Sequence, residues 1–393
     1  MSNESNQIPN TLQSKARRYM REHGVRYLPA LAAITAEASA ESRAPARGSL
    51  REDVNNSAGV EAWLQALGID DLATYEPAEM WGRSAGAAHL IPIPIGILCA
   101  APARGDVAVE GETEVHSQEV AFLDLDALSS GVVQGMIGTG RAALDQWVIG
   151  ALSVLNGPDK IQFVVLDFKG ALAGEQLSGI PHVAACFDVL HEDSGAKISA
   201  LCSMIEAEIV RREQILRIHH VSSIQQYRRK SGAAAPPDLI VFVTEAFEYM
   251  ELYQTRRRIL RVASMAAHAG VHLIVSGQLL GTEVDEIREQ IKFGISLRAA
   301  NDRASTRVLG RSDAVELPLA SGRAYLVRYP SISTDLECLQ IFGPLHSGAL
   351  GSWEKVLAKL SQTPHRADEF SRAIAALAVQ TAKLDLAVDG PGK

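Results

Sequence analysis

Long hydrophobic runs are missing from this sequence of 393 residues. The longest apolar stretch, 90–101, contains Pro92 and Pro94 and is shorter than the ~20 residues that a membrane-spanning helix requires. Residues 1–10 are polar and lack the apolar core of a signal peptide. We therefore expect neither a membrane span nor export, and the sequence indicates a cytoplasmic protein.

Cysteine is also scarce, and the chain has four: Cys99, Cys186, Cys202 and Cys338. They are widely separated and form no C-x-x-C motif, so they predict neither a disulfide scaffold nor a zinc site. We interpret all four as reduced cysteines that pack in the interior. The histidines show no spacing typical of metal ligands, so no metal site is expected from them.

The chain is acidic, with 38 Lys and Arg residues against 46 Asp and Glu residues and a net charge of -8. This balance argues against nucleic acid as the main partner, because nucleic-acid-binding surfaces are basic. Hydrophobic residues make up 47% and charged residues 21% of the chain, which excludes wholesale disorder. At roughly 100–200 residues per domain, the length allows two or three domains.

Short apolar runs alternate with segments of helical spacing. The runs are Val120–Leu125, Val132–Gln134, Ile161–Asp167, Val183–Phe187, Leu239–Thr244, His272–Ser276 and Phe293–Leu297. Helical spacing occupies 141–155, 196–219, 222–230, 254–268 and 283–290. This pattern predicts an α/β fold with a mostly parallel sheet and helices on both faces. A terminal strand pair, Gly322–Val327 and Cys338–Phe342, and a helical tail over 349–384 are also predicted.

A glycine-rich segment follows the run that ends at Gln134 and opens the predicted helix 141–155. Its residues are Gly135, Met136, Ile137, Gly138, Thr139, Gly140, Arg141 and Ala142. The spacing is that of the phosphate loop G-x-x-x-x-G-K-[ST], in which backbone N–H groups wrap a phosphate chain. Arg141 replaces the lysine and Ala142 replaces the hydroxyl that holds Mg²⁺. ATP binding is therefore possible and Mg²⁺ placement doubtful; the alternative is a strand-to-helix turn without a ligand.

A second candidate motif is the apolar strand that ends in Thr244 and Glu245. In phosphate-loop ATPases such a strand ends in Asp-Glu, where Asp holds the Mg²⁺ shell and Glu activates water. Thr244 stands at the Asp position, from which it could contact only a metal-bound water, and Glu245 remains as a vestigial catalytic residue. Gln278 follows the next buried strand, where RecA-like folds place a sensor of the γ-phosphate. An ordinary polar strand end is the alternative for each of these positions.

Further segments appear in a fixed order along residues 59–343. They are Leu67-Gly68-Ile69, Ile93-Pro94-Ile95-Gly96, Asp167-Phe168-Lys169-Gly170, Pro181-His182-Val183, Glu208 with Arg211-Arg212, Gly270-Val271-His272, Leu297-Arg298, Arg307-Val308-Leu309-Gly310 and Gly322 with Tyr325-Leu326. Together with the phosphate loop, this order resembles the FtsK/SpoIIIE group of RecA-like ATPases. More narrowly, it is similar to the EccC ATPase modules of type VII (ESX) secretion.

The sequence departs from the family pattern at the positions whose side chains bind Mg²⁺ and phosphate in the family. The family has Lys-Ser where this chain has Arg141 and Ala142, and Asp where it has Thr244. The family's Ser-Gln-Arg after the following strand becomes Gly277, Gln278 and a leucine. The resemblance therefore implies a degenerate, non-hydrolysing module, of a kind that the EccC family itself contains. Two alternatives stay open: an active ATP-dependent protein or DNA translocase, and a nucleotide-free interaction scaffold.

The resemblance also implies a domain plan and partners. We expect a helical segment and linker over 1–58, an EccC-like pre-domain over 59–119, a RecA-type ATPase domain over 120–343 and a helical tail over 344–393. The implied partner is an EccC-like ATPase or the helical tail of a secreted protein, in a homo- or hetero-oligomer. Through such a partner, the protein would be peripheral to the inner membrane.

Overall fold

The computed structural model describes residues 62–85, 87–99, 119–168, 177, 179–188, 194–231, 235–245, 257–258, 260–261, 266–278, 285, 288–319, 321–329, 336–343, 347–365 and 367–377. Their strands form one sheet of ten strands in the order β2-β1-β10-β9-β8-β3-β7-β6-β4-β5. The bounds are β1 Ile93–Leu98, β2 Val120–Leu123, β3 Ser130–Gln134, β4 Ile161–Asp167, β5 Val183–Asp188, β6 Asp238–Thr244, β7 Val271–Gly277, β8 Ile291–Ser296, β9 Arg323–Arg328 and β10 Glu337–Ile341.

Six neighbouring strands, β8-β3-β7-β6-β4-β5, are all parallel, as the apolar runs predicted. Their residues are buried on both faces because helices cover both sides. In β4, Phe163 and Val165 belong to one hydrophobic core, whereas Val164 and Leu166 belong to the core on the opposite face. This period of two is what a central strand between two helical layers requires.

The other four strands form an antiparallel wing. β9 pairs with β8, β10 with β9, β1 with β10 and β2 with β1, each antiparallel. The strands β9 and β10 are the last two along the chain and pair with each other, as predicted, and β1 from the N-terminal side lies on the other side of β10. One sheet thus contains strands from both sides of residue 119, which is the boundary between the expected pre-domain and the expected ATPase domain.

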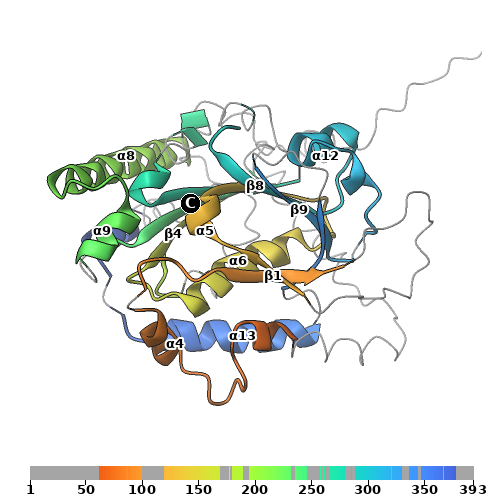
Figure 1. Cartoon of the computed structure of the whole chain (residues 1–393), viewed down its shortest axis with the longest axis horizontal. Coiled ribbons are helices and arrows are strands. Elements are labelled where there is room, and N and C mark those ends of the chain that lie inside the picture. The colour runs from red at the N-terminus through yellow and green to blue at the C-terminus, as the bar shows by residue number, and fades with distance from the viewer. Residues whose placement is uncertain are drawn as a thin grey trace, which may run out of the picture.

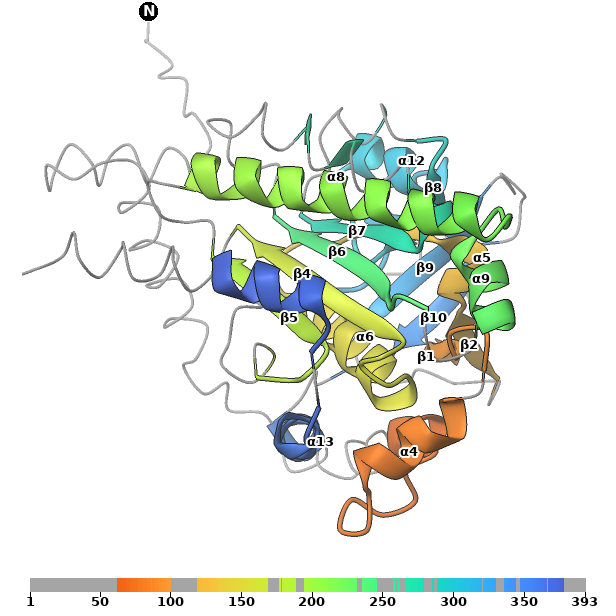
Figure 2. The same ribbon diagram turned by 90° about the vertical axis from the view of Figure 1, so that its left-hand side faces the viewer.

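The helices lie in layers on the two faces of the sheet (Figures 1 and 2). α8 (Ser194–Ile218) and α12 (Asp302–Leu309) cover one face, and α6 (Arg141–Leu155) covers the other. α4 (Pro77–Ser84) and α13 (Ser347–Gln362) pack outside α6, which is therefore buried between the sheet and these two helices. Two further helices, α5 (Leu125–Leu128) and α9 (Ile224–Ser231), are short. In the described part, no helix is both long enough and apolar enough to cross a membrane.

The bounds of the predicted helices agree with the structure to different degrees. α6 occupies the predicted residues 141–155, and α8 and α9 lie within two residues of prediction. The predicted helical tail over 349–384 consists of two helices in the described part: α13 ends at Gln362, and helix resumes at 369, because Pro364 cannot continue the first helix. Residues 378–384 lie outside the described residues. Residues 267 and 268, predicted as the end of an α-helix, lie instead in a 3-10 turn over Ala267–Ala269 that Gly270 ends. About half of 254–268 and of 283–290 lies outside the described residues, and the described residues 288–290 form a turn.

Candidate functional site

The glycine-rich segment lies between the end of β3 and the start of α6, as a phosphate loop should. Gly138 and Gly140 have φ of 83° and 97°, a left-handed conformation that side chains with a Cβ rarely adopt. At Gly135, an added Cβ would lie 2.8 Å from Thr139 Oγ1 and 3.0 Å from Leu297 Cβ. The three glycines are therefore required by the tight strand-to-helix turn itself.

The turn leaves backbone donors at its outer side. Met136 N–H donates to Arg298 O (3.0 Å) and Thr139 N–H to Met136 O (3.3 Å), which fixes the base of the loop. Among the described residues, none accepts a hydrogen bond from the N–H of Ile137 or Gly138, and both residues are exposed. Together with the first N–H groups of α6, these donors form a cradle that fits phosphate oxygens.

Arg141 turns away from this cradle and into the protein. Its side chain is 9% exposed, and its Nη2 forms an ion pair with the Oε1 of Glu245, a residue 104 positions further on. Its Nη1 donates to Asp145 Oδ2 (3.1 Å) and to Ser276 Oγ (2.9 Å). The guanidinium therefore holds together Glu245, Asp145 one helical turn further along α6, and Ser276 at the end of β7. We call these four residues the Arg141 cluster.

The second acid of the Arg141 cluster is wholly buried. Asp145 Oδ2 accepts a further hydrogen bond from Ser276 Oγ (2.6 Å). Burial raises the pKa of Asp145 to about 6, although the nearby charge of Arg141 and the hydrogen bond from Ser276 work in the opposite direction. The Oδ1 atom of Asp145 and the Nε of Arg141 have no hydrogen-bond partner among the described residues. The cluster is thus rich in charge and incompletely satisfied.

Glu245 adopts an unusual backbone conformation. Its φ is 54°, in the left-handed region, although it carries a side chain. Its N–H donates to Ser276 O (2.8 Å), and its Oε2 accepts from the backbone N–H of Gln278 (3.0 Å). Gln278 therefore meets Glu245 through its main chain. Such backbone strain is stored where the surroundings over-determine a residue, which is typical of functional sites.

Thr244 is engaged with a neighbouring strand. Its Oγ1 donates to Asp167 Oδ1 (3.0 Å), and both residues are fully buried at the ends of β6 and β4. Ala142 offers no oxygen, and the Arg141 cation lies beside Glu245. These residues do not fit Mg²⁺, which needs several free oxygen ligands. The described residues also contain no group of three or more His, Cys, Asp or Glu side chains that could hold a metal.

The structure brings together the positions that the sequence singled out. The phosphate loop, Thr244, Glu245 and Gln278 all lie at the carboxyl ends of β3, β6 and β7, where open α/β sheets bind ligands. The sequence analysis missed Asp145 and Ser276. Asp145 could have been found from its i+4 spacing to Arg141 on the predicted helix. No spacing rule could connect Ser276, which is 135 residues from Arg141.

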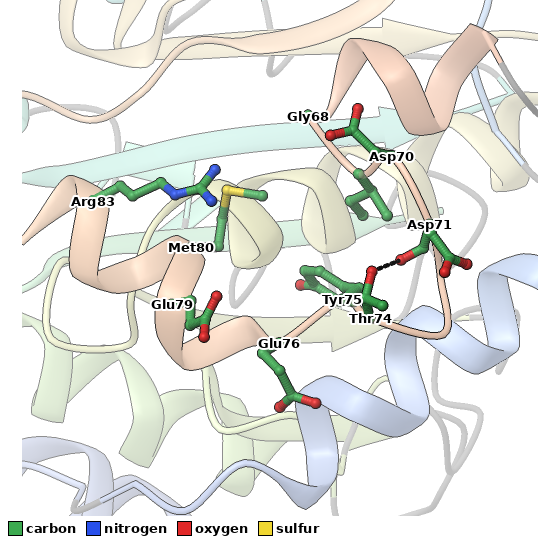
Figure 3. A pocket seen from close by; sticks show the side chains of 10 residues that line it. Gly68, Asp70, Asp71, Thr74, Tyr75, Glu76, Glu79, Met80 and Arg83 are labelled. Carbon is green, nitrogen blue, oxygen red and sulfur yellow. Dashed lines mark hydrogen bonds between the residues drawn. The ribbon is translucent and has the colours of Figure 1, made fainter.

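A separate hollow lies between the loop after Gly68 and helix α4 (Figure 3). Its volume is about 260 Å³, and Figure 3 shows that one helix face and the preceding loop line it. Four carboxylates and one cation surround it: Asp70, Asp71, Glu76, Glu79 and Arg83. Because acidic walls repel phosphates, this hollow does not suit a nucleotide, and no residue of the phosphate loop lines it.

The parallel strand order and the glycine loop that opens α6 define an ATPase fold of the P-loop class. The comparison with protein families makes the assignment narrower. A family model described as the FtsK/SpoIIIE family matches residues 101–323, which is more than half of the chain. The chain belongs to the FtsK/SpoIIIE family.

Several known relatives are proteins of type VII secretion systems. The chain is 26% identical over 271 residues to the ESX-4 secretion system protein EccC4 of Mycobacterium tuberculosis, an alignment that covers 67% of this chain and 21% of EccC4. The chain thus spans about a fifth of the length of that relative. Among solved structures, the cytoplasmic domain of the Thermomonospora curvata type VII secretion ATPase EccC superposes with a TM-score of 0.62 and 22% identity, covering 78% of this chain and 35% of that one.

A second superposition is with ATPases 2 and 3 of Thermomonospora curvata EccC in complex with a signal sequence peptide. Its TM-score is 0.54 at 20% identity, and it covers 70% of this chain and 48% of that chain. At these identities the structural likeness establishes the fold. The relation to EccC-type ATPases, together with the family match, makes this chain a relative of the type VII secretion ATPase modules.

Proposed function

We propose that this chain is a non-hydrolysing FtsK/SpoIIIE-type module that works with the motor of a type VII-like secretion machine. The observation that carries the proposal is the ion pair between Arg141 and Glu245. In an active phosphate-loop ATPase, the cation reaches the β/γ-phosphates and the glutamate activates water. Here the two groups neutralise each other inside the protein.

The electrostatics of the Arg141 cluster support this reading. A buried guanidinium shared by two carboxylates is held by charge-assisted hydrogen bonds. Extracting it toward a nucleotide would leave Glu245 and Asp145 buried without their cation, which costs on the order of 3–5 kcal/mol for a broken buried pair. Any ATP in the cradle would therefore be held by backbone N–H groups alone, without Mg²⁺ and without turnover.

The proposed partners follow from the relatives. EccC is a type VII secretion ATPase, and a structure of its ATPases 2 and 3 holds a signal sequence peptide. We infer that this chain binds an EccC-like ATPase or the helical tail of a secreted protein, in a homo- or hetero-oligomer. The acidic net charge of -8 favours a protein partner over nucleic acid. The place of action would be the cytoplasm, at the inner membrane through the partner.

The test combines hydrolysis with stability in the variant Glu245→Gln. Wild-type protein is expected to turn over ATP far below ~1 s⁻¹, the lower end of ordinary kinase rates. In the variant the residual rate should stay unchanged, whereas the free energy of unfolding should fall by about 3 kcal/mol, because Arg141 loses an ionic partner. Phosphate release and urea unfolding measure the two quantities.

Glu213→Gln is a matched control, because Glu213 is 40% exposed and pairs with His268 at the surface. It should change neither quantity by much. An active ATPase would give the opposite result: Glu245→Gln would abolish a substantial rate and leave stability nearly intact. A Mg²⁺-dependent rise in melting temperature with ATP would likewise contradict the proposal.

A further inference from the structure

Two cysteines that are distant in sequence meet at the end of the ladder between β1 and β10. Cys99 directly follows β1, Cys338 lies within β10, and their sulfur atoms are 3.3 Å apart. The backbone N–H of Cys99 donates to Cys338 O (2.9 Å), and the pair continues the register that joins Leu98 to Leu339. Both cysteines are free, as the sequence predicted, but the fold places them side by side, which their sequence spacing could not predict.

The position of the pair suits a disulfide bond. Residues directly opposite on antiparallel strands have Cα atoms about 4.5–5.5 Å apart. That spacing falls within the roughly 4.4–6.8 Å that disulfides span. Both sulfur atoms already lie on the same side of the ladder, in contact. Closing the bond therefore needs side-chain rotation and a small approach of the sulfurs, with no rearrangement of the strands.

The two thiols are unequal in a way that assigns their roles. Cys99 is partly exposed, whereas Cys338 is 4% exposed. The hydrogen bond with Cys338, together with the nearby charge of Arg323, lowers the pKa of Cys99 to about 7 even though burial opposes this. The same hydrogen bond and burial raise the pKa of Cys338. Cys99 is thus the reachable thiolate and Cys338 the protected thiol beside it.

We propose that Cys99 and Cys338 form a thiol–disulfide exchange site that closes a bond between β1 and β10 when the protein meets a small-molecule disulfide. The Cys99 thiolate attacks one sulfur of that disulfide, forms a mixed disulfide and expels a thiolate. The Cys338 sulfur, after losing its proton to solvent, then attacks Cys99 Sγ and expels the second thiolate. Two protein thiols are oxidised, the small disulfide is reduced to two thiols, and the released protons end on those thiols.

Loss of the Cys99 thiol also helps the second step. In the reduced protein, the neighbouring Cys99 sulfur raises the pKa of Cys338. Once Cys99 carries the mixed disulfide, its sulfur has no proton and no negative charge, so this effect is lost. Cys338 can then ionise more readily, and it lies next to the sulfur that it attacks. The inference concerns a site remote from the phosphate loop and does not depend on whether ATP is hydrolysed.

The experiment exposes the folded full-length chain to oxidised glutathione, blocks free thiols with iodoacetamide after denaturation, and measures the intact mass and a peptide map. Wild-type protein should carry alkyl groups on Cys186 and Cys202 and a linked peptide that joins Cys99 to Cys338. Cys338→Ser should instead retain one glutathione on Cys99, because the resolving thiol is gone. Cys99→Ser should give neither product.

Cys186→Ser is the matched control and should form the internal bond as wild type does. Circular dichroism and the melting temperature of each reduced variant show that it folds. Full alkylation of all four cysteines in oxidised wild type would overturn the proposal, as would a glutathione adduct on wild-type Cys99 that never resolves. A glutathione adduct on Cys338 in Cys99→Ser protein would also overturn it, because Cys338 would then be the reachable thiol.

Discussion

At the residue scale, the planar guanidinium of Arg141 determines the character of the site. Lysine offers one compact charge, whereas arginine presents several N–H donors in a fixed fork that can engage two carboxylates at once. Arg141 uses this fork on Asp145 and Glu245, and Ser276 completes the set. The cation at position 141 therefore lies in the interior of the protein and not in the loop.

The buried acid Asp145 should make stability depend on pH. Its folded pKa of about 6 lies above the ordinary 3.8, so the fold favours the neutral acid. This contribution is fully present below the unfolded pKa and is lost as pH rises through 6. Between pH 4 and 7, wild type should lose about 3 kcal/mol relative to Asp145→Asn, as two pKa units imply. Urea unfolding at several pH values measures the difference.

The exposed carboxylate of Asp70 gives the control for this prediction. Asp70→Asn should stay within about 0.5 kcal/mol of wild type, because a substitution at an exposed position away from the core usually changes the free energy of unfolding little. If the curves of wild type and Asp145→Asn instead ran parallel from pH 4 to 7, the protonation of Asp145 would not be coupled to folding.

At the scale of elements, α6 is the central support of the site, since it begins at Arg141 and packs under the sheet. Outside it, Trp353 of α13 packs against Trp147 of α6 and against Trp63, with ring centroids 5.1 Å and 5.6 Å apart. Gly150 makes this approach possible: a Cβ there would lie 2.2 Å from Trp353 Cζ2. The helix that carries the phosphate loop is thus held by close packing on its outer side.

Gly150→Ala should therefore destabilise the protein, although alanine is the better helix former. Overpacking against a buried tryptophan costs typically 1–3 kcal/mol, which outweighs the gain in propensity of about 1 kcal/mol. Gly351→Ala in α13 is the matched control: a Cβ there meets nothing within 4 Å, so only the favourable propensity remains. Thermal unfolding should show a lower melting temperature for the first variant and an equal or higher one for the second.

Elements with a single strong period were predictable from the sequence, and irregular ones were not. β4 and α6 have the predicted bounds because apolar runs and helical spacing determine them. β1 was noted only as an apolar stretch, since Pro94 and Gly96 interrupt its strand pattern. The phosphate loop was found because glycine spacing is local. The Arg141–Glu245 and Cys99–Cys338 contacts were not, because tertiary folding alone brings such distant residues together.

At the scale of the whole molecule, both ends of the described chain contribute to one core. The cluster on the α6 face contains Trp63 from the N-terminal side, the middle of the sheet and Trp353 from the C-terminal side. Residues far outside the family match are therefore part of the folding unit. Stability of the ATPase-like core should depend on them even though they contribute nothing to the phosphate loop.

Deleting residues 344–393 tests this dependence. The deletion removes α13 and with it four buried apolar side chains, Trp353, Val356, Leu357 and Leu360. At about 1.5–3 kcal/mol for each, the loss is comparable to the whole stability of a typical domain. The shortened chain should lose cooperative thermal unfolding and bind a hydrophobic dye.

Leu350→Ala serves as the control, because Leu350 of α13 is 41% exposed and this variant should melt nearly as wild type does. A chain without 344–393 that still unfolded cooperatively at the wild-type temperature would show that the core is independent of α13.

The pairing of β1 with β10 also determines where the polypeptide enters and leaves the sheet. β1 begins at Ile93 and β10 ends at Ile341, and because the two strands are antiparallel neighbours, entry and exit lie at the same end of one ladder. Adjacent strands are only about 4.8 Å apart. The segments that flank the sheet, with Trp63 before it and Trp353 after it, therefore leave from the same end of this ladder and pack against each other on one face. An insertion of this fold into a longer polypeptide would have to carry both flanking segments with the sheet.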